Sequence, residues 1–194
     1  FAEDVFRVLD NYSVEKAHIV GHSMGARVSL AATKLNPGRL RSLTMMDAGV
    51  EVSLSASTEV HKIIDNLPVQ FESKSQAEEF LSGHPISIKQ FLLSNLRNRD
   101  GVFKWNFDIE GIRRYFFSVI SQDQKPAWNS LRIPTLVLRG ERSLHLSQSE
   151  VEQMLIHQPL ARFNTVDNAG HWIHVDGFDQ TLEFIKVFLG EFSK

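Results

Sequence analysis

The sequence predicts an α/β fold, with a mostly parallel β-sheet, helices on both faces and a helical cap inserted into it. Three observations lead to this prediction. Short apolar runs alternate with amphipathic helical patterns over residues 1–48 and again over residues 131–194. Residues 49–130 lose this alternation and are rich in large apolar side chains. A Gly-His-Ser-Met-Gly turn joins the first strand to the second helix. We therefore expect 1–48 and 131–194 to form the sheet core and 49–130 to form the cap.

The composition is that of an ordinary globular domain and excludes several classes of protein. The 194 residues carry a net charge of −2, and 42% of them are hydrophobic, which allows a sizeable core. Without a basic excess we predict no nucleic-acid partner, and without cysteine no disulfide or thiolate metal site. No apolar run approaches the ~20 residues of a membrane helix, and no signal-peptide pattern is present. We expect a cytoplasmic protein with no membrane partner.

The first core segment is predicted to contain a helix, a strand, a helix and a strand. Phe1–Tyr12 has apolar residues at helical spacing, and Ala17–Val20 is a short buried strand. Met24–Leu35 is helical until Asn36-Pro37-Gly38 stops it, and Leu40–Met46 is the next strand. Strand, helix and strand over about 30 residues form one βαβ unit with parallel strands.

The cap is predicted to be mostly helical, with capping patterns at Ser75–Glu78 and Ser87–Gln90. Its large apolar residues would form a small core and also line an acyl pocket, because an insertion here lies over the carboxyl ends of the strands, where open α/β sheets bind ligands. Among them we predict Trp105 and Phe107 as substrate-binding residues.

The last core segment is predicted to add two strands and two helices. Ile133–Arg139 is a strand, a helix runs from Ser147 to His157, and Ala161–Val166 is the last strand. After the loop Asp167–Val175, a closing helix has an apolar stripe from Phe178 to Leu189.

The turn Gly21–Gly25 has the G-x-S-x-G pattern of the nucleophile elbow found in α/β-hydrolases. The pattern also occurs by chance on surface loops, but here the required strand and helix flank it. Ser23 would be the nucleophile, lifted out of the sheet by the sharp turn, with the two glycines keeping Cβ atoms out of the way. The backbone N–H of Met24, at the positive end of the helix, would donate to an oxyanion.

The candidate base is His171, in a loop after the last strand. His171 and His174 form a His-x-x-His pair, but no third ligand stands at a sensible spacing, so we predict no metal and no cofactor. His22 directly precedes the nucleophile, so we expect its side chain to face elsewhere. We predict His22 and Trp172 as further substrate-binding residues.

The acid that orients the base has two candidate positions. The commoner one is the loop after the penultimate strand, where Ser143 stands at the place expected for aspartate and Glu141 comes too early. The other is Asp47, at the end of the strand that neighbours the elbow strand. Asp47 could also be a solvated loop acid. We favour Asp47, which would fix the tautomer of His171 and stabilise its charged form.

Along its whole length the chain resembles the YbfF-type esterases, the bacterial relatives of abhydrolase-domain protein eleven. The segments that carry the resemblance are Gly21–Gly25, Met46–Ala48, Phe91–Leu96, Trp105–Phe107, Leu138–Gly140 and Ala169–Trp172. The resemblance implies hydrolysis of carboxylic esters or acyl-CoA thioesters, with the acid at Asp47. The family usually has Gly-Gly-Asn-Ser after the penultimate strand, where this chain has Gly140-Glu141-Arg142-Ser143.

The fold should begin with strands and a helix that this sequence lacks before Phe1. They normally supply the second oxyanion donor, whose loss costs on the order of 10²–10³ in rate. We therefore expect these 194 residues not to be fully active alone. The open edge of the elbow strand would pair with the N-terminal segment or with another chain.

The predicted reaction is acyl transfer from a small ester or thioester through an acyl-enzyme on Ser23. Two alternatives stay open. The same triad could serve a C–C hydrolase or a cofactor-free haloperoxidase, or the scaffold could be a ligand-binding, receptor-like protein without turnover. The presence of both Ser23 and His171 argues against the second alternative.

Overall fold

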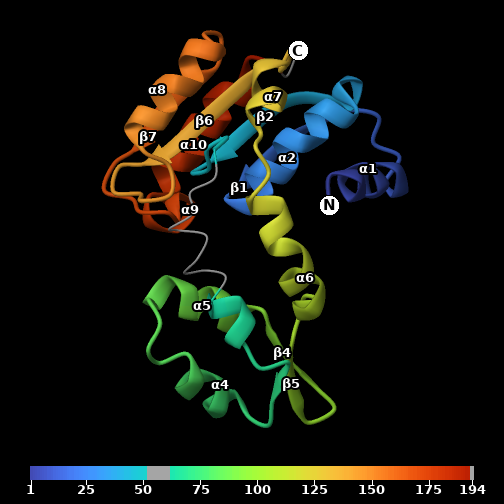
Figure 1. The fold of residues 1–194 in the computed structure, drawn as a ribbon, viewed down its shortest axis with the longest axis vertical. Coiled ribbons are helices and arrows are strands. Elements are labelled where there is room, and N and C mark those ends of the chain that lie inside the picture. Colours follow the sequence, from blue (N-terminus) through green and yellow to red (C-terminus); the bar gives the residue numbers. More distant parts are fainter. Residues whose placement is uncertain (52–61, 193–194) are drawn as a thin grey trace. The chain divides into compact units, whose positions relative to one another are not determined.

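The computed structural model describes residues 1–51 and 62–192, which fall into two compact units (Figure 1). The first unit comprises residues 1–56 and 119–194, and the second comprises residues 57–118. The second unit lies inside the range predicted for the cap.

The first unit is built on a four-stranded parallel sheet with the order β1-β2-β6-β7. Its strands are β1 (Ala17–His22), β2 (Leu40–Met46), β6 (Thr135–Gly140) and β7 (Arg162–Val166). Because all four run in one direction, their carboxyl ends meet at one edge of the sheet. The predicted α/β class with a parallel sheet is confirmed.

Helices cover both faces of this sheet. They are α1 (Ala2–Asn11), α2 (Met24–Leu35), the 3₁₀ turn η1 (Pro37–Arg39), α7 (Lys125–Asn129), α8 (Gln148–His157), α9 (Ile173–Asp176) and α10 (Phe178–Gly190). The predicted starts of α2, α8 and α10 agree with the structure. At α8, the side chain of Ser147 accepts a hydrogen bond from the backbone N–H of Glu150 and caps the helix.

Side chains alternate between the two faces of the sheet along each strand, so the apolar core of the first unit has one part on each face. Met45 and Val137 point to the face covered by α2, α7 and α8. Leu136 and Leu138 point to the opposite face, where they pack with residues of α9 and α10. Successive side chains of a strand point to opposite faces, so a strand that is covered on both sides is mostly apolar.

Strand β1 is less buried than predicted. It lies at one edge of the four described strands, and Val20 is 42% exposed. An edge strand has a neighbour on only one side, which leaves its other side open to solvent. Pairing of this edge with a further strand stays a prediction.

The second unit contains a small antiparallel sheet as well as helices (Figure 1). Its described elements are β3 (Gln70–Phe71), α4 (Lys74–Phe80), α5 (Ile86–Ser94), β4 (Leu96–Arg99), β5 (Val102–Trp105) and the start of α6 (Ile109–Ile120). The sheet was not predicted. Its signal is Asp100-Gly101, where both residues have positive φ (54° and 85°), as a two-residue hairpin turn between β4 and β5 requires.

The two helix starts predicted in the cap are displaced. The cap of α4 is Ser73, whose hydroxyl accepts a hydrogen bond from Gln76 N, and not Ser75. Helix α5 begins at Ile86, so Ser87 lies inside it and does not cap it. Several serines precede Glu or Gln by three residues here, so the pattern alone does not select the cap. Among the described residues, no helix is long and apolar enough to cross a membrane.

Candidate active site

The turn between β1 and α2 has the geometry of a nucleophile elbow. Ser23 adopts φ 55° and ψ −121°, a strained conformation for a residue with a side chain. A Cβ at Gly21 would lie 2.5 Å from the carbonyl oxygen of Gly25, so only glycine fits there. The reason predicted for Gly25 is wrong, because a Cβ there would meet no described atom within 4 Å.

Backbone hydrogen bonds continue past the strand ends and align the nucleophile with the acid. The N–H of Ser23 donates to the carbonyl of Met46 over 3.0 Å, and the N–H of Asp47 donates to the carbonyl of Leu138 over 2.8 Å. Ser23 and Asp47 therefore emerge side by side from neighbouring strands, at the carboxyl edge where α/β sheets place their sites.

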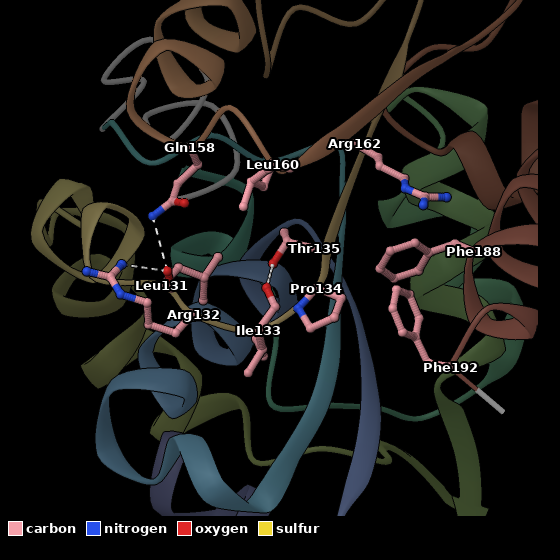
Figure 2. Close-up of a pocket in the computed structure, with 11 residues that line it drawn as sticks. Leu131, Arg132, Ile133, Pro134, Thr135, Gln158, Leu160, Arg162, Phe188 and Phe192 are labelled. Carbon is pink, nitrogen blue, oxygen red and sulfur yellow. Dashed lines mark hydrogen bonds between the residues drawn. The ribbon is translucent and has the colours of Figure 1, made fainter. Parts of the chain in front are cut away.

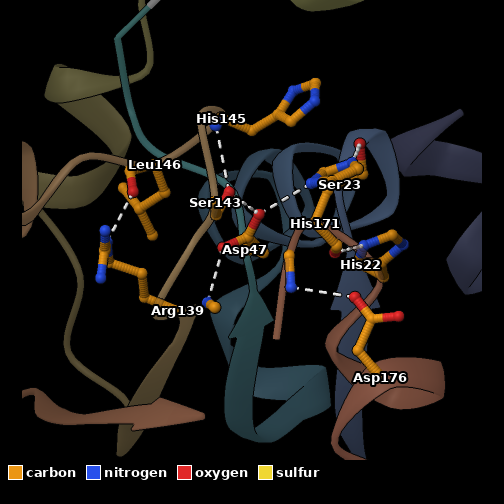
Figure 3. Close-up of polar contacts among 11 residues, drawn as sticks. His22, Ser23, Asp47, Arg139, Ser143, His145, Leu146, His171 and Asp176 are labelled. Carbon is orange, nitrogen blue, oxygen red and sulfur yellow. Dashed lines mark hydrogen bonds and ion pairs between the residues drawn. The ribbon is translucent and has the colours of Figure 1, made fainter. Parts of the chain in front are cut away.

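The structure brings Ser23, His171 and Asp47 together in one chain of hydrogen bonds (Figure 3). The Oγ of Ser23 lies 3.0 Å from Nε2 of His171, and Nδ1 of His171 lies 2.7 Å from Oδ2 of Asp47. The His171 side chain is 15% exposed and that of Asp47 is fully buried. With Nδ1–H donating to the carboxylate, Nε2 is left to accept the proton of Ser23.

Asp47 is not a solvated loop acid. Its Oδ1 accepts the N–H of Gly140 over 2.9 Å, and its Oδ2 accepts the hydroxyl of Ser143 over 2.5 Å as well as His171 Nδ1. A buried carboxylate is stable only when its oxygens receive hydrogen bonds. Asp47 also has a positive φ of 50°, so the backbone turns sharply at the strand end.

The loop after β6 is hydrogen-bonded to the loop that carries His171. A Cβ at Gly140 would lie 2.0 Å from the carbonyl oxygen of Gly170, so the two loops can approach only because this residue is glycine. The N–H of Arg142 donates to Ala169 O over 2.9 Å. Glu141 accepts the N–H of Asn168 over 2.7 Å, so this carboxylate braces the His171 loop instead of contacting the base.

Three further histidines surround His171, and sequence reasoning missed this cluster. His22 does not face elsewhere: its Nε2 lies 2.8 Å from the carbonyl oxygen of His171, and the two ring centroids are 4.6 Å apart. His145 stacks on His171 with centroids 3.8 Å apart and planes 27° apart. His174 lies 4.6 Å from His22 between centroids. His174 is close to His171 in the sequence, but only the fold brings His22, at the end of β1, and His145, in the loop after β6, to the same place.

Burial keeps the surrounding histidines neutral. Loss of solvent, followed by the nearby charge of His171, lowers the pKa of His22 and the pKa of His145 to about 4. Burial also lowers the pKa of His174. Around neutral pH, His171 therefore has uncharged imidazole neighbours. Among the described residues, no group of three or more His, Asp or Glu could hold a metal ion.

The predicted substrate-binding residues occupy two different environments. Trp172 lies beside the base, with its ring 5.8 Å from that of His171 and 5.4 Å from that of His22. Trp105 is a core residue of the second unit, where its Nε1–H donates to Pro68 O and its ring stacks on Phe107. Their contacts with substrate stay predictions.

The predicted oxyanion donor lies at the first residue of α2. The carbonyl of Ser23 already accepts the N–H groups of Ala26 and Arg27. The N–H of Met24 has no acceptor among the described residues, and it lies at the positive end of a 12-residue helix. It is therefore available to a negatively charged oxygen next to Ser23.

A cavity of about 550 Å³ lies at the other end of the sheet, at the amino ends of β6 and β7 (Figure 2). Apolar side chains such as Ile133, Leu160 and Phe188 line most of it, and the guanidinium of Arg162 at its margin is paired with Glu191. None of the predicted site residues lines this cavity, so it is separate from the site around Ser23.

Comparisons with known proteins agree with the fold. A family model described as the alpha/beta hydrolase family matches residues 1–184. The chain is 27% identical to esterase YbfF of Escherichia coli K12, covering 98% of the chain and 74% of that esterase. It is 28% identical to the sn-1-specific diacylglycerol lipase ABHD11 of Xenopus laevis, covering 89% of the chain and 58% of that lipase. The predicted resemblance to the YbfF-type esterases is confirmed.

Solved structures share the fold. An E-2-(acetamidomethylene)succinate hydrolase superposes with a TM-score of 0.84 at 22% identity, covering 98% of this chain and 72% of the other. A marine microorganism esterase superposes with a TM-score of 0.78 at 23% identity, covering 98% and 75%.

Proposed function

The chain belongs to the alpha/beta hydrolase family, and from this premise we propose that it is a serine hydrolase that cleaves carboxylic esters. The observation that carries the proposal is the continuous hydrogen-bonded chain from Ser23 through His171 to Asp47, with the serine at the head of α2. The names of the relatives, an esterase and a diacylglycerol lipase, support an ester as the substrate.

In the first half of the reaction, Oγ of Ser23 attacks the ester carbonyl carbon while its proton passes to Nε2 of His171. The buried carboxylate of Asp47 stabilises the imidazolium that forms, and the N–H of Met24 donates to the oxyanion. The intermediate collapses when Nε2–H gives its proton to the leaving alcohol, which leaves an acyl-enzyme on Ser23.

In the second half, Nε2 of His171 takes a proton from water, and the resulting hydroxide attacks the acyl carbon. The proton returns to Oγ of Ser23 as the carboxylic acid departs. The same sequence cleaves a thioester, with a thiol as the leaving group. Acyl-CoA thioesters are therefore a second substrate class within this proposal.

Fluorophosphonate labelling of the full protein tests the proposal. We expect a covalent adduct on Ser23, located by peptide mapping, and hydrolysis of p-nitrophenyl butyrate that Ser23→Ala abolishes. Ser149→Ala, on the exposed side of α8, is the matched control and keeps both properties. A folded protein that shows neither an adduct nor Ser23-dependent hydrolysis contradicts the proposal. Comparing butyryl-CoA with p-nitrophenyl butyrate separates thioester from ester preference.

A further inference from the structure

The loop between β6 and α8 contacts the acid and the base of the candidate triad at the same time (Figure 3). The hydroxyl of Ser143 donates to Asp47, and its oxygen accepts the backbone N–H of His145 over 3.0 Å. That backbone bond fixes the start of a side chain whose ring stacks on His171, with centroids 3.8 Å apart and planes 27° apart. The loop between β6 and α8 therefore contacts both Asp47 and His171.

Hydrogen bonds hold only the edges of the His171 ring. Nδ1 is held by Asp47 and Nε2 points to Ser23, and both lie on the rim of the imidazole. Small rotations about the Cα–Cβ and Cβ–Cγ bonds can still tilt the ring plane while both hydrogen bonds are kept. A flat partner against its face removes this freedom, and His145 supplies such a face.

The chemistry of the stacked partner suits a base that becomes charged in every cycle. The titratable groups that face His145 are His171 and Asp47, and those that face His171 also include His22 and His174. Burial lowers the pKa of His145 to about 4, so its ring stays neutral when His171 takes the proton of Ser23. A neutral aromatic face attracts a cation, whereas a charged partner would repel it.

We propose that His145 is a positioning residue for the general base: its ring, stacked on His171, keeps Nε2 directed at Ser23 through both proton transfers. The inference rests on the proposed function, because it assigns His145 a part in the same reaction. Neither the G-x-S-x-G pattern nor the loop position of His171 points to this residue.

Three variants of His145 separate its possible contributions. His145→Ala removes the face, and we expect kcat to fall about tenfold with KM nearly unchanged, because a small misplacement of the base is costly. His145→Phe restores a flat neutral face, and we expect most of the lost kcat to return. His145→Arg stacks a fixed positive charge on His171. We expect it to shift the acid limb of the kcat/KM profile to lower pH by about half a unit or more. His157→Ala, at the exposed end of α8, is the matched control and leaves all three readouts unchanged.

Failure of this inference is distinguishable from failure of the proposed function. If the wild type hydrolyses esters through Ser23 but His145→Ala retains its kcat and pH profile, His145 does not position the base. The inference is also overturned if His145→Phe is as slow as His145→Ala. If Ser23-dependent hydrolysis is absent altogether, the proposed function fails. An NMR titration of the His171 ring then still decides the contact, because equal titration midpoints in the Phe and Arg variants would show that position 145 does not contact the base.

Discussion

The hydroxyl of Ser143 donates to Oδ2 of Asp47, the same oxygen that accepts Nδ1 of His171. Ser143 stands in the loop where this fold more commonly carries its acid, and here that position supplies a hydrogen-bond donor to an acid from the neighbouring strand. Asp47 follows β2 and Ser143 lies in the loop after β6, and the carboxylate of the first and the hydroxyl of the second meet beside Nδ1 of His171.

Loss of the Ser143 hydroxyl should weaken both stability and turnover. Ser143→Ala leaves the buried Asp47 carboxylate with two donors in place of three, so we expect the free energy of unfolding to fall by about 1–2 kcal/mol. We expect kcat to fall about fivefold, since the acid then holds the base less firmly. Urea unfolding and ester hydrolysis measure the two effects. The exposed Ser149→Ala serves as control, and equal behaviour of the two variants would contradict the role of this hydrogen bond.

Asp47 should be the acid that orients the base. In Asp47→Asn the side-chain amide can donate to Nδ1, which favours the wrong tautomer of His171, so we expect kcat to drop by about 10⁴ while the fold is retained. Ester hydrolysis, with circular dichroism as the check on folding, measures this. Asp179→Asn, at the exposed start of α10, makes the same chemical change away from the site. Retention of more than a tenth of the wild-type kcat by Asp47→Asn would assign the role to another acid.

The two glycines of the elbow should respond differently to alanine. Gly21→Ala puts a Cβ 2.5 Å from the backbone of Gly25, so we expect a loss of about 3 kcal/mol of unfolding free energy and of fluorophosphonate labelling. Gly25→Ala meets open space inside a helix, and we expect stability to stay within about 1 kcal/mol of the wild type or to rise. Equal losses in both variants would mean that the strained turn needs glycine at both positions.

Stability should fall as the pH drops from about 6.5 towards 4. His22 and His145 have a pKa of about 4 in the folded protein and an ordinary value of 6.5. Between these values the unfolded chain binds protons that the folded protein does not, so the stabilisation is complete above pH 6.5 and is lost as the pH falls. Urea unfolding over this range measures the slope.

A single variant assigns part of this slope to His22. His22→Asn can still donate to the carbonyl of His171 but does not titrate, so we expect a shallower fall in stability than in the wild type. His157→Asn makes the same substitution at an exposed position and should leave the slope unchanged. A slope in His22→Asn equal to that of the wild type would show that His22 is not held neutral by the fold.

Arg27 should be needed to hold the two segments that lead to and from the second unit. It is 5% exposed and donates to the carbonyls of Gly49, Glu51 and Gln122. Arg27→Met keeps the apolar stem but leaves these carbonyls without their donor, and we expect a loss of about 2–4 kcal/mol of unfolding free energy. Lys34→Met, on the exposed side of the same helix, is the control. A thermal midpoint of Arg27→Met equal to that of Lys34→Met would contradict this role.

Local sequence patterns predicted correctly those helices and strands whose bounds depend on residues close together in the sequence. Met24–Leu35 and Leu40–Met46 have the predicted bounds, because helical spacing, strand alternation and an Asn-Pro-Gly stop act within a few residues. Two local features in the range predicted for the cap were not predicted correctly. The hairpin at Asp100-Gly101 was overlooked, and the cap of α4 is two residues earlier than predicted.

The candidate nucleophile and base were predicted from the sequence because each lies in a short segment with a recognisable local pattern. The G-x-S-x-G turn predicted Ser23 as the nucleophile, and the loop after the last strand predicted His171 as the base. Asp47 was the favoured one of two positions for the acid. The tertiary structure alone decided that Asp47 is buried beside His171, that Ser143 donates to it and that His145 stacks on the base. These contacts join residues up to 124 positions apart, and they depend on the parallel register of β2, β6 and β7, which no local pattern encodes.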